Sequence, residues 1–491
     1  MRKKDHLMVK KPNAFLYFIA YILAYPFLKI TFRLKVNRSC FNPPKGPFIV
    51  LANHESFIDF LLVMLAFYPY RLNAVAAQKY FNFRPLNWLL PIMGAIPKYL
   101  FETDMRAVLS IMRVIKRGDQ LLIFPEGRDS VHGPYMGMIK STGKLIKKLE
   151  VPVVSCNIEG SYNCAPFWRK GFRRGRIRVT FANLFSAEDV QRLTVDEIND
   201  RIDARLSGAD AMPAQALSLD GKALSVDKLP EGKSSSADKP SEDKPSSAES
   251  PPEGKPSSSD KPLTLFKAKK LVEGLENILY YCPCCHSEFT LKTADNIISC
   301  TTCGITATMD RSSVFSAGRV GVVCREAAVS GQETGSGEGV VGKQDAGSGA
   351  DAFPKTVSDW YTTQVLYEKQ RLEEGVDLVR TEVLVSMPLD RGRGFAIRGQ
   401  GELRLDSKGW HFDGEIAGEN TQLLFPINTV PVVPFEPNYS IQICKGKDFY
   451  DFLPRDNPRA SAKYATIGEC AYWRFASTIQ MTPGKDSAFP Q

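Results

Sequence analysis

A stretch of low-complexity sequence divides this chain of 491 residues into two parts. From about residue 207 to 262 the composition collapses into Ser, Pro, Lys, Asp and Glu, and the unit Asp-Lys-Pro recurs. Such a segment cannot bury enough apolar surface to fold, so we predict a disordered linker over 207–262. A second stretch, rich in Gly and Ser, predicts another linker over 327–352. The chain is therefore expected to contain several folded units rather than one.

Charge divides the chain at the same place. Residues 1–206 carry 32 Lys and Arg against 16 Asp and Glu, whereas the rest of the chain has a net charge of −7. A basic first part indicates an anionic partner, such as lipid head groups, a phosphorylated substrate or nucleic acid. Uncharged apolar runs of membrane-spanning length do not recur along the chain, which excludes a polytopic transporter.

The segment 1–38 is predicted to anchor the protein to a membrane. Uncharged residues run from Pro12 to Leu28 between basic flanks, and a helix of this length is just short of a comfortable bilayer crossing. Pro26 is expected to bend or end that helix. The basic flanks favour the cytoplasmic face of the cell membrane. A cleaved signal peptide and a buried core helix are the alternatives, and large or basic residues follow where a cleavage site needs small ones.

Residues 39–206 are predicted to form an α/β domain. Short apolar runs bounded by turn residues indicate buried strands, and stretches with helical spacing lie between them. Strands that alternate with helices predict a mostly parallel sheet flanked by helices. The expected strands are 47–53, 119–125, 151–158 and 176–183, and the expected helices are 57–68, 105–118 and 139–150.

The first chemical motif, Asn53 to Asp59, directly follows the first expected strand. Acyl transfer to a hydroxyl needs a base and a carboxylate that orients it, and His54 and Asp59 are residues of those types. On one continuous helix the two side chains would point apart, so they can meet only if the helix begins between them. Ser56 offers such a beginning. The alternative is that Asp59 merely caps the helix.

The second motif, Phe124-Pro125-Glu126-Gly127-Arg128-Asp129-Ser130, follows the expected strand 119–125. Ligands of α/β sheets bind at the carboxyl ends of strands. Arg128 suits a phosphate because its planar guanidinium donates two parallel hydrogen bonds. The alternative is a plain turn with a solvated ion pair.

The order and spacing of these motifs, over roughly residues 10–206, resemble the glycerolipid acyltransferase family. The pattern N-H-x-x-x-x-D is met by Asn53, His54 and Asp59. The pattern F-P-E-G-x-x-S is met by Phe124, Pro125, Glu126, Gly127 and Ser130, with Arg128-Asp129 where most members have Thr-Arg. Two further segments of this chain resemble the family's other motifs more weakly. They are Gly94 to Lys98, where Lys98 replaces the usual Arg, and Val151 to Ser155.

The resemblance implies an O-acyltransferase of phospholipid biosynthesis. It would move a fatty acyl chain from an acyl thioester, acyl-CoA or acyl carrier protein, to the free hydroxyl of lysophosphatidic acid, giving phosphatidic acid. His54 would be the general base, Asp59 would orient it, and no catalytic cofactor is implied. Another lysophospholipid or glycerol 3-phosphate remains open as the acceptor, and a non-catalytic membrane adaptor is the rival function. The residues implied to position the acceptor are Gly94, Lys98, Glu126, Gly127 and Arg128.

Cysteines gather in the predicted unit 263–326, for which we expect a helix over 263–279 and then a zinc ribbon. Five of the eleven Cys lie between 282 and 303. Two C-x-x-C pairs, fourteen residues apart, are typical of a closed structural zinc site. The expected ligands are Cys282, Cys285, Cys300 and Cys303, with Cys284 and His286 as possible replacements in the first pair. Because this half is acidic, we expect no nucleic-acid partner.

The unit 353–480 is predicted to be rich in β structure. A helix around Trp360 comes first, then about seven strands with hairpin turns at 407–409 and 445–447, and a final helix around 460–476. This arrangement loosely resembles small bacterial PH/GRAM-like domains. Because the linker 207–262 is long, we expect the C-terminal half to be separable from the domain that holds His54 and Asp59.

Overall fold

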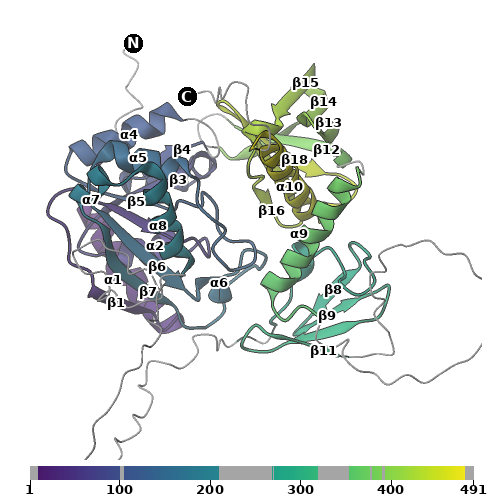
Figure 1. The fold of residues 1–491 in the computed structure, drawn as a ribbon, viewed down its shortest axis with the longest axis horizontal. Coiled ribbons are helices and arrows are strands. Elements are labelled where there is room, and N and C mark those ends of the chain that lie inside the picture. Colours follow the sequence, from purple (N-terminus) through teal and green to yellow (C-terminus); the bar gives the residue numbers. More distant parts are fainter. Residues whose placement is uncertain are drawn as a thin grey trace, which may run out of the picture.

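The structure, a computed structural model, describes residues 9–99, 104–208, 268, 270–318, 353–375, 379–389 and 393–480. The predicted linkers lie outside the described residues, apart from Ser207 and Gly208. Figure 1 shows an N-terminal domain, coloured purple to teal, beside a smaller ribbon-like unit and a C-terminal sheet in green and yellow.

A seven-stranded sheet in the order β1-β7-β6-β2-β5-β3-β4 forms the centre of the N-terminal domain. All neighbouring strands pair in parallel except β6 and β7, which are antiparallel. The predicted α/β fold with a mostly parallel sheet is therefore confirmed. The strands are β1 (Lys35–Cys40), β2 (Ile49–Ala52), β3 (Leu72–Ala77), β4 (Ile96–Lys98), β5 (Gln120–Ile123), β6 (Val153–Glu159) and β7 (Arg178–Phe185).

Helices cover both faces of this sheet. Along β2, Val50 and Ala52 belong to one hydrophobic core and Ile49 and Leu51 to the other, so the strand is buried on both faces. That double burial explains why its sequence is a continuous apolar run. The helices are α2 (Asp59–Ala66), α3 (Leu86–Ile92), α4 (Met105–Lys116), α5 (Ser141–Leu149), α6 (Ser161–Cys164), α7 (Ala187–Arg192) and α8 (Val195–Ser207).

The N-terminal helix α1 (Ala14–Thr31) lies against the domain with only one face. Tyr17 is fully buried, and its hydroxyl accepts a hydrogen bond from the backbone N–H of Leu72 at 3.2 Å. On the outer face Phe15, Leu23 and Ile30 are 68, 69 and 81% exposed. Pro26 lies within the helix without ending it. By length and composition α1 is apolar enough to cross a membrane, and it is not the buried core helix that was the alternative.

The unit around the cysteines is a four-stranded antiparallel sheet in the order β11-β10-β9-β8. The helix expected over 263–279 is wrong for the described residues 270–279, which hold only a short 3₁₀ helix at Leu275–Asn277. Gly274, with φ +97°, breaks the helical path there, and a Cβ at that position would meet the Trp168 carbonyl oxygen at 2.6 Å. The strands are β8 (Leu291–Ala294), β9 (Ile297–Cys300), β10 (Thr306–Met309) and β11 (Phe315–Gly318).

The C-terminal unit is a seven-stranded antiparallel sheet in the order β15-β14-β13-β12-β18-β17-β16, with helices α9 (Val357–Glu373) and α10 (Ala460–Gln480). Both predicted hairpins are present, since Asp406 pairs with Gly409 and Lys445 with Asp448. The resemblance to PH/GRAM-like domains stays a prediction. The strands are β12 (Val379–Pro388), β13 (Phe395–Asp406), β14 (Gly409–Ile416), β15 (Glu419–Pro426), β16 (Phe435–Glu436), β17 (Ser440–Lys445) and β18 (Asp448–Pro454).

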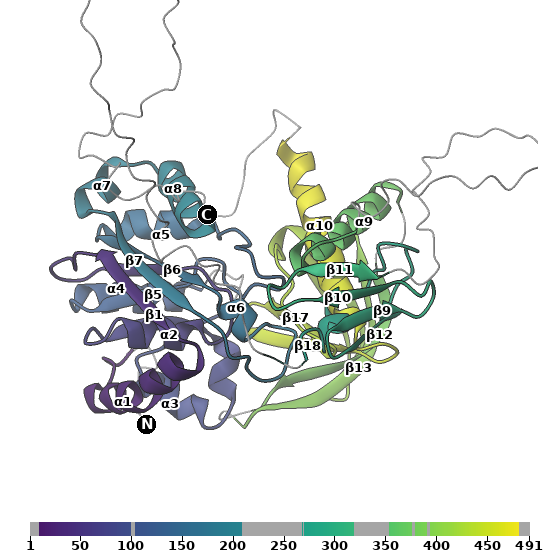
Figure 2. The ribbon, with the colours of Figure 1, turned by 90° about the horizontal axis from the view of Figure 1, so that it is seen from below.

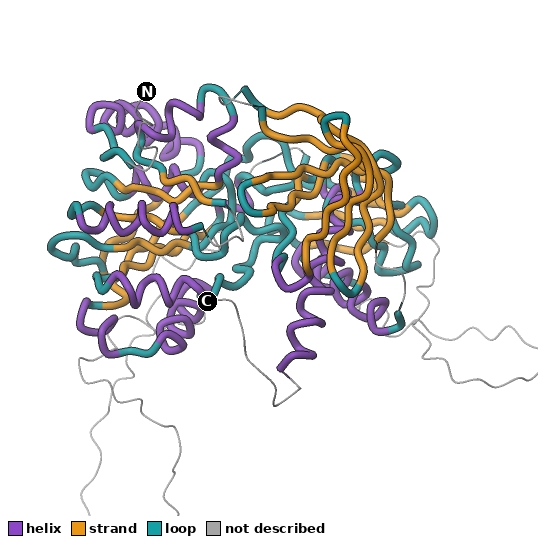
Figure 3. The backbone as a smooth tube through the Cα atoms, turned by 90° about the horizontal axis from the view of Figure 1, so that it is seen from above, coloured by secondary structure: helices purple, strands orange, loops and turns teal. Residues whose placement is uncertain are grey.

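The C-terminal half is docked on the N-terminal domain, as Figures 2 and 3 show. Val131 and Trp168 of the N-terminal domain belong to the same hydrophobic core as the cysteine unit and the C-terminal sheet. The rings of Phe167 and Phe435 meet edge to face with centroids 5.2 Å apart. A shared core of this kind does not support the expectation that the C-terminal half is separable.

Candidate active site

His54 and Asp59 meet, as the first motif predicts. The Nδ1 atom of His54 lies 3.1 Å from Oδ2 of Asp59, and the Asp59 side chain is completely buried. The contact is possible because α2 begins at Asp59 itself, so His54 lies before the helix. Ser56 donates its backbone N–H to the same Oδ2 at 2.7 Å, so Asp59 also holds the turn before α2. The N-cap residue of α2, Ile58, makes no side-chain capping bond, so Asp59 supports the turn before the helix in addition to contacting His54.

The second motif holds the backbone of His54 from both sides. The backbone N–H of His54 donates to Oε1 of Glu126 at 2.6 Å, and its carbonyl accepts the N–H of Ser130 at 2.7 Å. Oε2 of Glu126 accepts the N–H of Met136 at 2.9 Å. The ring of His54 stacks on Phe124 with centroids 4.2 Å apart. Glu126 and Ser130 thus fix the position of His54.

The electrostatics favour a histidine that accepts a proton. Burial lowers the pKa of His54, but the hydrogen bond and charge of Asp59 outweigh it, so the pKa is raised above 6.5. With Nδ1 bonded to Asp59, Nε2 is the nitrogen left to accept a substrate proton. Burial also raises the pKa of Glu126 to about 7. Burial and the charge of Asp59 raise the pKa of Glu55, whose carboxylate accepts hydrogen bonds from Ser161 and Tyr162, to about 8.

Gly94 lies two residues before β4, and Lys98 is the last residue of that strand. Gly94 has φ +78°, and an added Cβ would lie 2.5 Å from Nδ2 of Asn73. That packing explains the glycine without a substrate contact. Lys98 ends β4, whose neighbour in the sheet is β3. Its ammonium group is therefore at the carboxyl edge of the sheet, the edge at which His54 also follows its strand.

Arg128 makes a contact that sequence reasoning missed. Its guanidinium forms a two-pronged ion pair with Glu469 of α10, in which Nη2 lies 2.9 Å from Oε2. Glu469 also accepts the backbone N–H of Val433 at 3.3 Å. In this arrangement the two donors that suit a phosphate are directed at a carboxylate of the C-terminal half. The phosphate role of Arg128 stays a prediction, and it requires Glu469 to leave.

Two further residues near the site had no signal in the sequence. Lys79 follows β3 and lies 2.9 Å from Oε1 of Glu436 and 3.0 Å from Oε1 of Gln442, both in the C-terminal sheet. Glu469 is also far along the chain from its partner Arg128, at a separation of 341 residues. Neither residue is part of a local pattern, so only the folded structure shows that Lys79 and Glu469 form contacts between the two halves.

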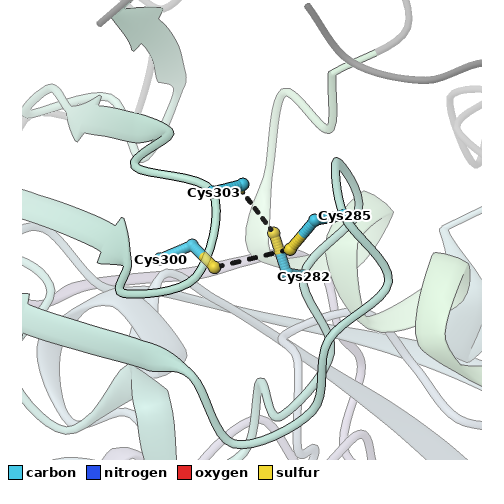
Figure 4. A group of neighbouring side chains, drawn as sticks. All are labelled: Cys282, Cys285, Cys300 and Cys303. Carbon is cyan, nitrogen blue, oxygen red and sulfur yellow. Dashed lines mark hydrogen bonds between the residues drawn. The ribbon is translucent and has the colours of Figure 1, made fainter. Parts of the chain in front are cut away.

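The four predicted zinc ligands come together, as Figure 4 shows. The sulfur atoms of Cys282, Cys285, Cys300 and Cys303 all lie within 4.8 Å of one another. Cys282 and Cys303 are 3.8 Å apart and Cys285 and Cys300 are 3.6 Å apart. Four thiolates at Zn–S distances of about 2.3 Å in a tetrahedron are separated by about 3.8 Å, so these residues fit a zinc ion. The geometry selects Cys285, not Cys284, for the first pair.

A histidine held by a buried carboxylate, at the carboxyl edge of a mostly parallel sheet, has the geometry needed to accept and return a proton. Comparison with known proteins agrees: residues 33–159 match the model of the Acyltransferase family. Residues 33–159 therefore form an acyltransferase domain, in agreement with the resemblance that the two motifs predicted.

Two chloroplastic 1-acyl-sn-glycerol-3-phosphate acyltransferases are similar to this chain. The protein of Brassica napus is 26% identical over 183 residues, 36% of this chain and 49% of the relative. That of Arabidopsis thaliana is 26% identical over 183 residues, 36% of this chain and 48% of the relative. The chain thus spans about half the length of the curated relatives it matches. The crystal structure of the 1-acyl-sn-glycerophosphate acyltransferase PlsC of Thermotoga maritima matches 39% of this chain and 79% of that chain, with 24% identity and a TM-score of 0.33.

We expect the pH dependence of acyl transfer to report the His54–Asp59 contact. The predicted base is neutral His54, so kcat/KM is expected to rise with pH through an apparent pKa above 6.5 and then level off. Asp59→Asn removes the carboxylate that stabilises the charged imidazole, so this limb should move to lower pH while the plateau falls. A pH–rate profile of both proteins measures the shift. A limb that does not move would mean that Asp59 only stabilises the turn before α2.

We also expect the Arg128–Glu469 pair to stabilise the docked arrangement. Glu469→Gln leaves a largely buried guanidinium without its charged partner, which should lower the free energy of unfolding by about 3 kcal/mol. The double variant Arg128→Met, Glu469→Leu should lose less than the sum of the single variants. Glu419→Gln, on the exposed start of β15, is the matched control. Additive losses in chemical denaturation would contradict a direct pairing.

Proposed function

We propose that the protein acylates lysophosphatidic acid to phosphatidic acid, using an acyl thioester as donor. The observation that carries this proposal is the buried Asp59 carboxylate 3.1 Å from His54, in a domain of the Acyltransferase family. The two similar plant proteins are named for acylation of 1-acyl-sn-glycerol 3-phosphate, which supports the choice of acceptor. Another lysophospholipid and glycerol 3-phosphate are the other acceptors to be compared.

In the proposed mechanism Nε2 of His54 removes the proton of the acceptor hydroxyl. The hydroxyl oxygen attacks the thioester carbonyl carbon, the carbon–sulfur bond breaks, and the leaving thiolate receives the proton from His54. Asp59 keeps the imidazole in the required tautomer and stabilises its charged form. Glu126 and Ser130 hold the His54 backbone, and Gly127, with φ +72°, allows the loop between them to turn sharply. Lys98 offers charge for the acceptor's phosphate.

We propose that α1 lies on the cytoplasmic surface of the cell membrane. Its inner face is occupied by contacts such as that of Tyr17 with Leu72, while Phe15, Leu23 and Ile30 project outward. Apolar side chains on one face of a helix, beside a basic domain, favour an anionic lipid surface. This position would bring the site close to its lipid substrates.

We propose that the four-cysteine group holds a structural zinc ion. Four thiolates close the coordination shell, so the ion would supply folding energy and no open position for chemistry. The cysteine unit also forms hydrogen bonds with α9 and with the N-terminal domain. Trp360 of α9 donates its Nε1–H to the Tyr281 carbonyl at 2.8 Å, and Arg169 donates to the Lys270 carbonyl at 2.5 Å.

His54→Ala should lower the rate of acyl transfer by about 10²–10⁴, because it removes the general base. The measurement is product formation from lysophosphatidic acid and a labelled acyl-CoA in detergent, with mass identification of the lipid. His411→Ala is a matched control, since His411 is also five residues from an aspartate, Asp406, and lies 3.0 Å from it on the C-terminal sheet. The control should retain full activity. Absence of transfer to any acceptor in the folded wild type would instead favour the membrane adaptor.

Cys285→Ser should abolish zinc binding, whereas Cys284→Ser should retain it. Only the first variant removes one of the four clustered sulfur atoms. Metal content by elemental analysis distinguishes the two. Loss of zinc should also lower the melting temperature, because the unit depends on the metal for its folding. Equal zinc in both variants would show that His286 or Cys284 replaces Cys285.

A further inference from the structure

Two carboxyl groups lie close to His54, and the proposed mechanism uses only one of them. Asp59 contacts Nδ1 of His54 through Oδ2 at 3.1 Å. Glu55, the residue directly after His54, accepts two hydrogen bonds at its Oε2. One comes from the hydroxyl of Ser161 and the other from the backbone N–H of Tyr162, each at 3.1 Å. Glu55 therefore joins the segment of the base to α6.

One oxygen of this group has no hydrogen-bond donor. Oδ1 of Asp59 is buried, and no donor among the described residues bonds to it. A buried carboxylate oxygen without a donor is unfavourable, because it has lost its water and gained no protein partner. Burial raises the pKa of Asp59 and Ser161 lowers it in part, so the Ser161 hydroxyl lies within reach of both carboxyl groups. In this arrangement that hydroxyl donates to Glu55.

The oxygen of Ser161 is fixed by contacts on the far side of α6. Ser161 begins this helix and is completely buried. The hydroxyl of Tyr162, the next residue, donates to the carbonyl of Val131 at 3.0 Å. Ser56 donates its own hydroxyl to the carbonyl of Ala165, directly after α6, at 2.6 Å. The Ser161 hydroxyl proton can therefore turn from one acceptor to another while its oxygen stays in place.

Glu55 and Asp59 do not favour being charged together. Like charges in a buried site repel, so one of the two groups takes up a proton. Asp59 stays ionised, because its Oδ2 contacts His54 and also accepts the backbone N–H of Ser56 at 2.7 Å. Burial and the charge of Asp59 raise the pKa of Glu55 to about 8. At neutral pH Glu55 therefore carries the proton.

Other ionisable groups surround the two carboxyl groups on the elements packed against them. They are Cys156 of β6, Cys164 of α6, Arg173 after α6, and Glu126 and Asp129 after β5. Burial raises the pKa of both thiols, so they stay neutral near pH 8. Burial also raises the pKa of Glu126 to about 7. A substitution of Glu55 alone isolates its contribution, because it leaves these groups in place.

We propose that Glu55 and Ser161 are positioning residues for the base, and that Glu55 keeps a proton so that the Ser161 hydroxyl can turn to Oδ1 of Asp59. The protonated carboxyl of Glu55 donates its O–H to Oγ of Ser161, and Ser161 donates to Asp59. Each proton then has one acceptor, and Asp59 is held at both of its oxygens. Loss of the Glu55 proton to solvent reverses this turn and places a second negative charge beside Asp59. The kinetic consequence of this inference rests on the proposed acyltransferase function.

The first test measures stability against pH in the full chain and does not depend on turnover. A carboxyl group whose pKa is raised on folding stabilises the folded chain fully below its unfolded value, here 4.5. That contribution is lost as the pH rises through the folded value of about 8. Glu55→Gln is neutral at every pH, so its melting temperature should rise relative to that of the wild type between about pH 5 and about pH 8. Glu188→Gln, at an exposed position of α7, is the matched control and should differ from the wild type by a constant amount. A constant difference for Glu55→Gln as well overturns the proposal.

The second test is the pH profile of acyl transfer. In the wild type the plateau above the His54 limb should end in a falling limb near pH 8, where Glu55 ionises. The fall should be about three- to tenfold, the effect of one buried hydrogen bond. The falling limb should be absent in Glu55→Gln and retained in Glu188→Gln. Ser161→Ala should lower kcat by about three- to tenfold with little change in the KM of either substrate, because Ser161 acts through Asp59.

The outcomes separate this inference from the proposed function. A falling limb that persists in Glu55→Gln, or a change in KM without a change in kcat in Ser161→Ala, overturns the inference. If the melting temperatures change as expected but the wild type transfers no acyl chain, the proposed function fails while the hydrogen-bonded arrangement of Glu55, Ser161 and Asp59 stands. An active enzyme in which Glu55→Gln changes neither pH profile refutes the inference and leaves the proposed function intact.

Discussion

The candidate site depends on the hydrogen bonds that hold the backbone of His54. Glu126 accepts its N–H and Ser130 donates to its carbonyl, so the loop after β5 fixes the residue that follows β2. Adjacent parallel strands bring these two loops together at one edge of the sheet. His54 of the first motif and Glu126 of the second are 72 residues apart in the sequence, yet they are joined by a hydrogen bond. A histidine held in this way needs little reorganisation before it accepts a proton.

The charge asymmetry of the chain also affects how its two halves pack together. The basic N-terminal part predicts an anionic partner, and two of its cationic side chains form ion pairs with carboxylates of the C-terminal half. Arg128 pairs with Glu469 and Lys79 with Glu436. Complementary charges orient the two halves, and the shared hydrophobic core stabilises their contact. Lys98 and Lys447 line a cavity that remains between them.

Much of the N-terminal domain was predictable because buried parallel strands leave continuous apolar runs. Strand β2 is such a run, buried on both faces, whereas β1 is mostly exposed, reads as polar and was missed. The prediction of a helix over 263–279 was wrong for a different reason. Leu271, Val272, Leu275 and Ile278 have helical spacing, but they are buried in a turn-rich segment that packs against the N-terminal domain. Periodicity alone does not distinguish these cases.

The sequence by itself determined the His54–Asp59 pair and the four cysteines, because in each case the chemistry depends on residues a few positions apart. A helix that begins at Asp59 brings together side chains five residues apart, and two C-x-x-C turns present four sulfur atoms to one point. Only the tertiary structure decided the partner of Arg128 and the walls of the cavity. Arg128 and Glu469 are 341 residues apart, and neither has a neighbouring residue that signals the other. Such contacts follow from how the folded units pack, which no local spacing encodes.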